Sequence, residues 1–488
     1  MKKRLINFSL SILCISIIQS CSNISRLEEC WNKQVKPIQE KLIEISFEEE
    51  LNELRHNFEP WKQTKYSIKG TLWVNGNKFL KLDTLTNSRG QKYFSKTDYS
   101  NGILMYLDYG EKNLTSITKD IMLEKIIKSA RYSPIPLIDY FMNNQSIVSE
   151  QVNQKHTIYS LNIDGKLIKV LIDNTSYLVS KITYLSHDEL YGDVLSTYSY
   201  SNHKNTNNLV SYASTIDIEK INGNIIEKVN LTTFKISPNE KVQLLDKPEG
   251  YKILESIDEK KPFLSVIKYN DFIHFIELQH TDDRVMVVEF DEFLLVAEAP
   301  LNSENGELII AEARKIAPSK PIKYFVFGHH HPHYLGGLRA FVHKEATIIC
   351  TEISEKYIEY IANAPHTLEP DSLQLESRPL KTIIVKDKLS IGKNEKMLIY
   401  FIGEKSKHTK DYLIYYFPSQ RLLFQDDLCW IASKGEIGKA RDRQVGLYNV
   451  IKELNINVDT IIQSWPVKDY GVKTIIPFQD LETSMNRK

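Results

Sequence analysis

Residues 322–337 read IKYFVFGHHHPHYLGG, which places four of the chain's 13 histidines within five residues after an apolar run. Because the run is short, apolar and rich in aromatic residues, it is expected to form a buried strand. On an extended backbone, side chains alternate between faces, so His329, His331 and His333 are expected on one side. His330 would point the other way. Three imidazoles that converge at a strand end suit a zinc ion. The stretch therefore predicts a metal site, with a solvated histidine-rich loop as the alternative.

A second polar cluster flanks two apolar runs further along the chain. His408 precedes a predicted strand at residues 411–417. Asp426 and Asp427 follow the next predicted strand, residues 421–424. If these two strands form a hairpin, the histidine and the carboxylates return to the same end of it. Histidine together with a carboxylate is a normal ligand set for zinc, manganese or iron.

From about residue 263 onward, predicted strands alternate with predicted helices, a pattern typical of α/β layers. The expected strands here are residues 284–290, 293–300, 322–328 and 346–351, and the expected helices are residues 304–316, 338–345 and 354–364. Neither a GxGxxG motif nor a phosphate-binding loop occurs, so the sequence gives no support for a nucleotide cofactor.

In this order, the motifs resemble those of the metallo-β-lactamase superfamily. That family has a strand, an HxHxDH loop with a Gly-Gly pair, a helix, a later His-Thr pair and an Asp at a strand end. Here Gly336-Gly337, His408-Thr409 and Asp427 occupy the corresponding places. The resemblance covers roughly residues 261–467, and more weakly the segment YGDVLSTYSYS in the N-terminal half. It also includes the segment APHTLEPDSL, as in a bacterial subgroup with an N-terminal β-domain.

The resemblance implies an α/β fold, an αββα sandwich with its metal site at the sheet edge. Carried over position by position, the family's first metal site is complete: His329, His331 and His408 would bind Zn²⁺. The family's bridging carboxylate matches Asp427. Asp426 is an equal chemical candidate one residue away.

The family's second metal site is not complete in this sequence. His333 replaces the family's Asp, Tyr334 replaces the following His, and Trp465 stands where the last His ligand belongs. An imidazole at 333 can still bind a metal or take up a proton near neutral pH. The phenol of Tyr334 titrates near about 10 and is a poor ligand. An indole only donates a hydrogen bond. These changes predict one zinc ion rather than two.

The N-terminal half shows a different pattern. Residues 22–60 carry apolar residues every three or four positions together with an acidic cluster, and they are expected to form a helical spacer. Residues 61–250 contain many runs with a period of two, which predicts an antiparallel, strongly curved β-rich domain resembling a half-barrel. An Asp164-Gly165 pair between two such runs is a hairpin signal. Residues 251–488 form the expected metallo-β-lactamase-like domain.

Residues 1–21 have the features of an export signal. Lys2, Lys3 and Arg4 precede an apolar run that is too short to span a membrane, and Ser20 and Cys21 end it. The segment IQSC resembles a bacterial lipoprotein cleavage box, in which Cys21 becomes the lipidated first residue. A plain signal peptide is the alternative. The expected location is therefore the bacterial cell envelope, with the membrane contacted through a lipid anchor.

The chain has 62 basic and 62 acidic residues, so its formal net charge is zero and nucleic acid is an unsupported partner. Two functions remain open. The first is a mono-zinc hydrolase, in which a metal-bound hydroxide attacks an unidentified ester, amide or phosphoester. His333 or Asp427 would then orient the water or act as the base, and Tyr334 would donate to the substrate. The alternative is an inactive lipoprotein on the same fold, which binds an apolar or envelope ligand. A metal-storage role for the HHHPH stretch is a weaker third reading.

Overall fold

The fold is described from a computed structural model. It describes residues 25–39, 41–54, 56–75, 78–100, 103–108, 113–117, 122–163, 166–206, 209–237, 249–250, 252–254, 262–468 and 470–487. The predicted signal segment and Cys21 lie outside these residues. Within them, no helix has both the length and the apolar character needed to cross a membrane.

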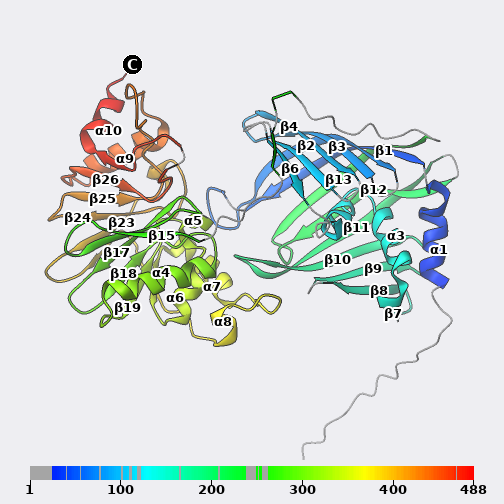
Figure 1. The fold of residues 1–488 in the computed structure, drawn as a ribbon, viewed down its shortest axis with the longest axis horizontal. Helices are drawn as coiled ribbons and strands as arrows, with labels where there is room; N and C mark the ends of the chain where they lie inside the picture. Colours follow the sequence, from blue (N-terminus) through cyan, green and yellow to red (C-terminus); the bar gives the residue numbers. More distant parts are fainter. Residues whose placement is uncertain are drawn as a thin grey trace, which may run out of the picture.

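The N-terminal half forms one large sheet that curves around helices (Figure 1). Its fourteen strands lie in the order β14-β6-β5-β4-β3-β2-β1-β13-β12-β11-β10-β9-β8-β7. The strands are β1 (Leu42–Glu53), β2 (Thr64–Asn75), β3 (Lys78–Thr86), β4 (Lys92–Ser100), β5 (Ile103–Asp108), β6 (Asn113–Ile117), β7 (Ser149–Val152), β8 (His156–Ile163), β9 (Lys166–Asp173), β10 (Val179–Asp188), β11 (Gly192–Thr206), β12 (Val210–Lys220), β13 (Ile225–Ser237) and β14 (Lys252–Leu254).

Three helices pack with this sheet and fill its core. They are α1 (Ser25–Gln34), α2 (Met122–Ser129) and α3 (Ile135–Asn143). Their buried side chains, such as Leu27, Ile127 and Phe141, share one apolar cluster with residues from the strands. The predicted hairpin is present, because β8 pairs antiparallel with β9. Its Asp164-Gly165 turn lies outside the described residues.

The expectation of a helical spacer is wrong for residues 42–53, which form strand β1 between β2 and β13. Ile43, Ile45 and Phe47 alternate with polar residues and are buried, so a period of two, not a helical one, governs this segment. The glutamates of the acidic cluster differ in their exposure. Glu49 is buried and paired with Arg131, whereas Glu48 is exposed.

The C-terminal half contains two sheets packed face to face. The first has the order β15-β16-β17-β18-β19-β20-β21 and the second β22-β23-β24-β25-β26-β27. The first comprises β15 (Leu264–Lys268), β16 (Ile273–Leu278), β17 (Asp283–Glu289), β18 (Leu294–Ala297), β19 (Ile322–Val326), β20 (Thr347–Cys350) and β21 (Thr382–Ile384). The second comprises β22 (Lys388–Ile391), β23 (Met397–Phe401), β24 (Leu413–Phe417), β25 (Leu422–Gln425), β26 (Thr460–Gln463) and β27 (Ile475–Pro477).

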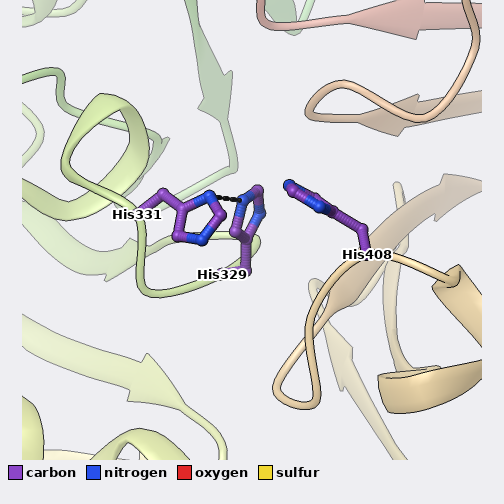
Figure 2. Close-up of side chains that lie close together, drawn as sticks. All are labelled: His329, His331 and His408. Carbon is purple, nitrogen blue, oxygen red and sulfur yellow. Dashed lines mark hydrogen bonds between the residues drawn. The ribbon is translucent and has the colours of Figure 1, made fainter. Parts of the chain in front are cut away.

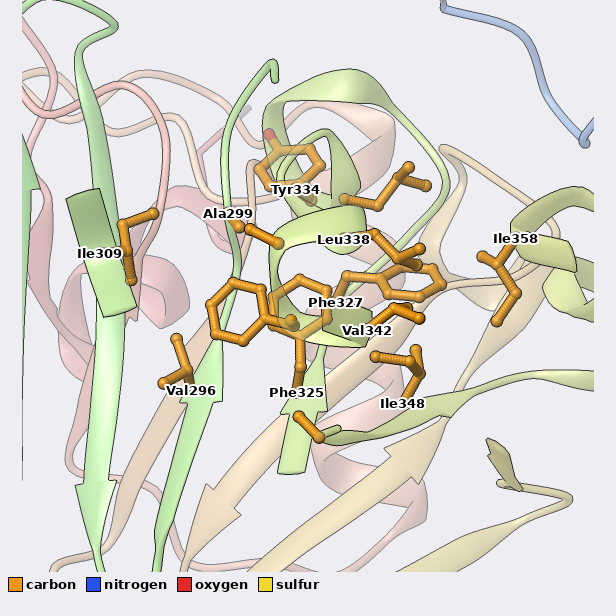
Figure 3. Close-up of a cluster of buried hydrophobic side chains, with 14 of the residues drawn as sticks. Val296, Ala299, Ile309, Phe325, Phe327, Tyr334, Leu338, Val342, Ile348 and Ile358 are labelled. Carbon is orange, nitrogen blue, oxygen red and sulfur yellow. The ribbon is translucent and has the colours of Figure 1, made fainter. Parts of the chain in front are cut away.

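Helices cover the outer face of each sheet. The first sheet carries α4 (Ser303–Ile316), α6 (Leu338–His343) and α7 (Glu352–Asn363), with the short α5 (Pro332–Leu335) and α8 (Ser372–Leu375) beside them. Their core includes Phe325 and Ile358 (Figure 3). The second sheet carries α9 (Asp442–Glu453) and α10 (Phe478–Met485). A third apolar cluster fills the space between the sheets. The order of layers is therefore αββα, as predicted.

The N-terminal half contacts the C-terminal half through the β12–β13 turn, where Asn222 donates to the hydroxyl of Tyr360 at 3.2 Å, and through two further segments. The first is the β1–β2 loop, described over residues 54 and 56–63, which reaches toward α5 (Figure 1). The second is the β10–β11 turn, where Asp193 accepts hydrogen bonds from the backbone N–H groups of Thr367 and Leu368 at 2.7 and 3.2 Å. The YGDV and APHTL segments of the sequence thus meet at this boundary.

Candidate metal centre

The two sequence clusters meet where the sheets of the sandwich are joined. His329 and His331 lie between β19 and α5, and His408 lies in the loop before β24. The backbone N–H of Leu413 donates to the carbonyl oxygen of Gly328 at 2.7 Å, which links the two sheets at this point. The three imidazole rings face one another (Figure 2). One nitrogen of each lies within 4.8 Å of the others, so the trio could hold a metal ion.

The hydrogen bonds of each ring show which nitrogen is directed at the shared space. Nδ1 of His329 lies 2.6 Å from a carboxyl oxygen of Asp426, and its Nε2 lies 3.0 Å from Nδ1 of His331. Nε2 of His331 lies 2.9 Å from the carbonyl oxygen of Asn57. Nε2 of His408 is buried and lies 3.1 Å from a carboxyl oxygen of Asp427. The candidate ligand atoms are therefore Nε2 of His329, Nδ1 of His331 and Nε2 of His408.

The electrostatics of the trio suit a metal cation. Burial, together with the charges of the neighbouring imidazoles, lowers the pKa of His329 and that of His331 well below the ordinary histidine value. Both rings are consequently neutral at neutral pH, which is the form in which imidazole binds a metal. Nε2 of His408 is a buried polar atom beside the carboxylate of Asp427, and histidine with a carboxylate is a normal ligand set for a metal ion. The donor set thus fits zinc.

Asp427 lies beside the trio as a carboxylate. One of its oxygens lies 3.1 Å from Nε2 of His408 and accepts a hydrogen bond from Arg443 at 2.8 Å. The other accepts from the hydroxyl of Tyr412 at 3.3 Å. Burial alone would raise the pKa of Asp427, but the charge and hydrogen bond of His408 and the charge of Arg443 outweigh it. The pKa of Asp427 is therefore held well below its usual range.

Asp426 lies behind the trio, against His329, and has a second buried carboxyl group as its neighbour. Glu298, which follows β18, accepts hydrogen bonds from the hydroxyl of Tyr415 at 2.8 Å and from the backbone N–H of Gly328 at 3.2 Å. Burial raises the pKa of Glu298 to about 8 and the pKa of Asp426 well above its ordinary value. A Cβ atom on Gly328 would lie 2.0 Å from an oxygen of Asp426, so glycine is needed at this contact. The sequence offered Asp426 and Asp427 as equal candidates for a metal ligand. In the structure Asp426 contacts His329, whereas Asp427 contacts His408.

The four layers and the histidine trio at the junction of the two sheets are the arrangement that the sequence resemblance implied. The αββα sandwich of the C-terminal half resembles the metallo-β-lactamase fold. Solved metallo-β-lactamases resemble this half at low sequence identity. One from Pontibacter korlensis is 15% identical with a TM-score of 0.34, covering 46% of this chain and 97% of that one.

Two further structures give similar values. FIM-1 from Pseudomonas aeruginosa in its mono-zinc form is 16% identical with a TM-score of 0.33, covering 46% of this chain and 93% of that one. A metallo-β-lactamase from Hirschia baltica is 14% identical with a TM-score of 0.32, covering 46% and 97%. No protein-family model matches the sequence, and no curated protein does.

His333 does not join the trio, contrary to the expectation that it would share a face with His329 and His331. The alternation of side chains ends because Pro332 begins helix α5. Nδ1 of His333 instead lies 3.1 Å from a carboxyl oxygen of the buried Asp283. Burial alone would lower the pKa of His333, but the hydrogen bond and charge of Asp283 outweigh it, so the pKa is raised.

The other two substituted positions of the metallo-β-lactamase fold are occupied by packed aromatic rings. Tyr334 is 2% exposed, belongs to the outer core cluster (Figure 3), and lies against His329 with ring centroids 4.4 Å apart. Burial, with the nearby Asp427 and Asp426 charges, raises its pKa well above the ordinary tyrosine value. Trp465 lies against His333, with ring centroids 5.4 Å apart.

Sequence reasoning missed three contributors to the site. Asn57 falls in the segment that was expected to be a spacer, and its loop carries no metal-site motif. Arg443 belongs to α9 and lies 16 residues after Asp427, but it matches no motif. Glu298 had a weak signal, because a carboxylate in the apolar run FLLVAEAP is an unusual buried charge. Its φ of 73° is a strained conformation that is concentrated at functional sites.

Proposed function

We propose that this chain is a single-metal hydrolase in which His329, His331 and His408 bind one zinc ion. The observation that carries the proposal is the convergence of one nitrogen from each ring within 4.8 Å, beside the carboxylate of Asp427. Three nitrogen ligands that leave further coordination positions are the ligand set of catalytic zinc sites. A zinc ion bound there would activate a water molecule as a nucleophile and polarise an ester, amide or phosphoester.

The chain's own residues would orient the reactants. Asp427 is ionised and held by Tyr412 and Arg443, so its carboxylate can accept a hydrogen bond from a nearby water molecule and orient it. His333, whose raised pKa favours the protonated ring, is a candidate proton donor for a leaving group. Tyr334 is buried within the core cluster, and we assign it a packing role rather than the substrate contact expected from the sequence.

The test compares the wild-type full chain, purified in mild detergent, with His408→Ala. Zinc content and hydrolysis of ester, lactone, thioester and phosphodiester probes are measured for both. His203→Ala, which removes an exposed histidine on β11, is the matched control. We expect close to one zinc per chain and a probe hydrolysed by the wild type and the control, with both properties lost in His408→Ala. A wild type that takes up no zinc when it is supplied contradicts the proposal.

A second candidate function is a binding protein on a catalytically inactive metallo-β-lactamase fold. It is favoured by Tyr334 and Trp465, which fill the positions of second-site ligands with aromatic rings. This candidate predicts that the wild type hydrolyses none of the probes even when zinc is bound. An apolar or envelope ligand that copurifies with the protein, detected by native mass spectrometry, would then support it.

We also propose that the chain is exported and anchored to the bacterial cell envelope through a lipid on Cys21. The support is the basic start, the short apolar run and the IQSC segment. Metabolic labelling with an alkyne fatty acid is expected to mark the wild type but not Cys21→Ala, with Cys30→Ala labelled like the wild type. Equal labelling of wild type and Cys21→Ala would contradict the anchor.

A further inference from the structure

The β1–β2 loop of the N-terminal half lies directly against the segment of the C-terminal half that carries His329, His330 and His331, the metal loop. The carbonyl oxygen of Asn57 lies 2.9 Å from Nε2 of His331, and the side-chain oxygen of Asn57 lies 2.8 Å from Nε2 of His330. The ring of His56, which is exposed, lies edge-on to His331 with centroids 5.2 Å apart. Two histidines of the metal loop are therefore contacted by a residue some 270 positions earlier in the chain.

The hydrogen bond between Nε2 of His331 and the carbonyl oxygen of Asn57 determines which ring nitrogen of His331 is protonated. A carbonyl oxygen only accepts hydrogen bonds, so Nε2 of His331 must be the donor. In a neutral ring the other nitrogen, Nδ1, then keeps its lone pair. Nδ1 is the atom that faces His329 across 3.0 Å. The N-terminal loop thus selects the tautomer of His331 that presents Nδ1 as a metal ligand.

The side chain of Asn57 fixes the loop in this position. Its amide nitrogen donates to the carbonyl oxygen of Lys62 at 2.6 Å, so its oxygen must be the atom that faces His330. On the other side of the ring, Nδ1 of His330 lies 2.9 Å from a carboxyl oxygen of Asp411. His330, which points away from the trio, therefore joins the metal loop to Asn57 and to the start of β24.

Three further contacts hold the same loop to the C-terminal half. The backbone N–H of Lys410 donates to the carbonyl oxygen of Phe58 at 2.8 Å, and its ammonium group lies 3.2 Å from Glu59. Lys410 is two residues from His408, so the loop contacts both segments that supply the trio. Trp61 packs against Tyr357 of α7, with ring centroids 5.0 Å apart.

We propose that the β1–β2 loop is a positioning element of the metal centre and that the N-terminal half therefore sets the metal affinity of the C-terminal half. Asn57 acts by holding His331 in the tautomer that binds metal, and it touches no reacting atom itself. This inference rests on the proposed three-histidine zinc site.

The first test measures the zinc dissociation constant of the full chain by competition with a chromogenic chelator. Partners that orient a ligand ring typically change metal affinity 10–100-fold. We expect Asn57→Ala to weaken zinc binding by about 10-fold or more, because its loop is released from Lys62 and His330. Asn57→Asp keeps an oxygen toward His330 and should recover part of the affinity. Asn153→Ala, which removes an asparagine that caps a turn far from the site, is the control.

Zinc binding by the wild type together with an unchanged dissociation constant in Asn57→Ala would overturn this inference and leave the proposed function standing. A wild type without zinc binding would contradict both. The second test needs no folded variant of Asn57. Nitrogen chemical shifts of the histidines in the zinc-free wild type, with His331 assigned by its absence in His331→Ala, should show a proton on Nε2. A proton on Nδ1 instead would overturn the inference.

Discussion

Two groups of residues at the candidate metal centre differ in their surroundings. The first side consists of His329, His331 and His408, and the second side consists of His333, Tyr334 and Trp465. On the first side, the rings of His329 and His331 each have one nitrogen bound by a second residue, Asp426 or Asn57, which leaves the other nitrogen directed at the shared space. On the second side, His333 is engaged by the buried carboxyl group of Asp283. Nitrogen atoms are thus oriented for a metal on the first side only.

The remaining positions of the second side serve packing. Tyr334 is part of the core cluster beneath the first sheet, and Trp465 lies with Trp430 and Tyr470 in an aromatic group. The indole of Trp465 only donates a hydrogen bond, and the protonated phenol of Tyr334 is a poor metal ligand. Tyr334 and Trp465 therefore contribute volume and ring contacts at positions where the sequence resemblance would place metal ligands.

We expect the largest difference between the two sides in their effect on zinc affinity. His331→Ala removes one of three ligands and should weaken zinc binding by more than about 100-fold, whereas His333→Ala should change it less than about threefold. Competition with a chelator measures both. If His333→Ala loses zinc as His331→Ala does, then His333 is a ligand and the two sides are not different.

The packing roles of the second side predict a difference in stability. Tyr334→Ala leaves a cavity in the core and should lower the free energy of unfolding by about 3–5 kcal/mol. Trp465 is only partly buried, so Trp465→Ala should cost about 1–2 kcal/mol. Urea unfolding at one pH measures both variants, with zinc removed by chelator. The reverse order would show that the tryptophan group, not the core cluster, organises this side.

The smallest expected effect concerns the carboxyl groups behind the first side. The folded pKa of Glu298 is about 8 against 4.5 as its ordinary value, so the folded chain holds this proton more tightly than the unfolded chain. The stability that this proton contributes is complete below pH 4.5 and is lost as the pH rises through 8. Glu298→Gln cannot lose a proton. Between pH 5 and pH 8 its free energy of unfolding should therefore rise relative to the wild type by at least about 1 kcal/mol.

Urea unfolding of the zinc-free proteins across this range provides the measurement. A free-energy difference between Glu298→Gln and the wild type that stays constant with pH would contradict the raised pKa.

Much of the C-terminal half could be predicted from the sequence because its signals are local. The apolar run before Gly328 forms β19, and the hairpin of β24 and β25 returns Asp427 to His408. Prediction failed where competing patterns overlapped. In residues 42–53 a helical spacing of apolar residues coexists with a period of two, and only pairing of β1 with β2 and β13 decided between them.

By itself, the sequence determined the αββα layers, the histidine trio and the loss of second-site ligands, since these depend on residue types and on short-range periodicity. Only the tertiary structure decided which nitrogen of each ring faces the shared space, and that Asp426 supports His329 while Asp427 lies beside His408. It also decided that Asn57, from another sheet, holds His331. The physical reason is that hydrogen bonds and burial depend on which atoms meet in space, and residues far apart in the chain leave no spacing that records their contact.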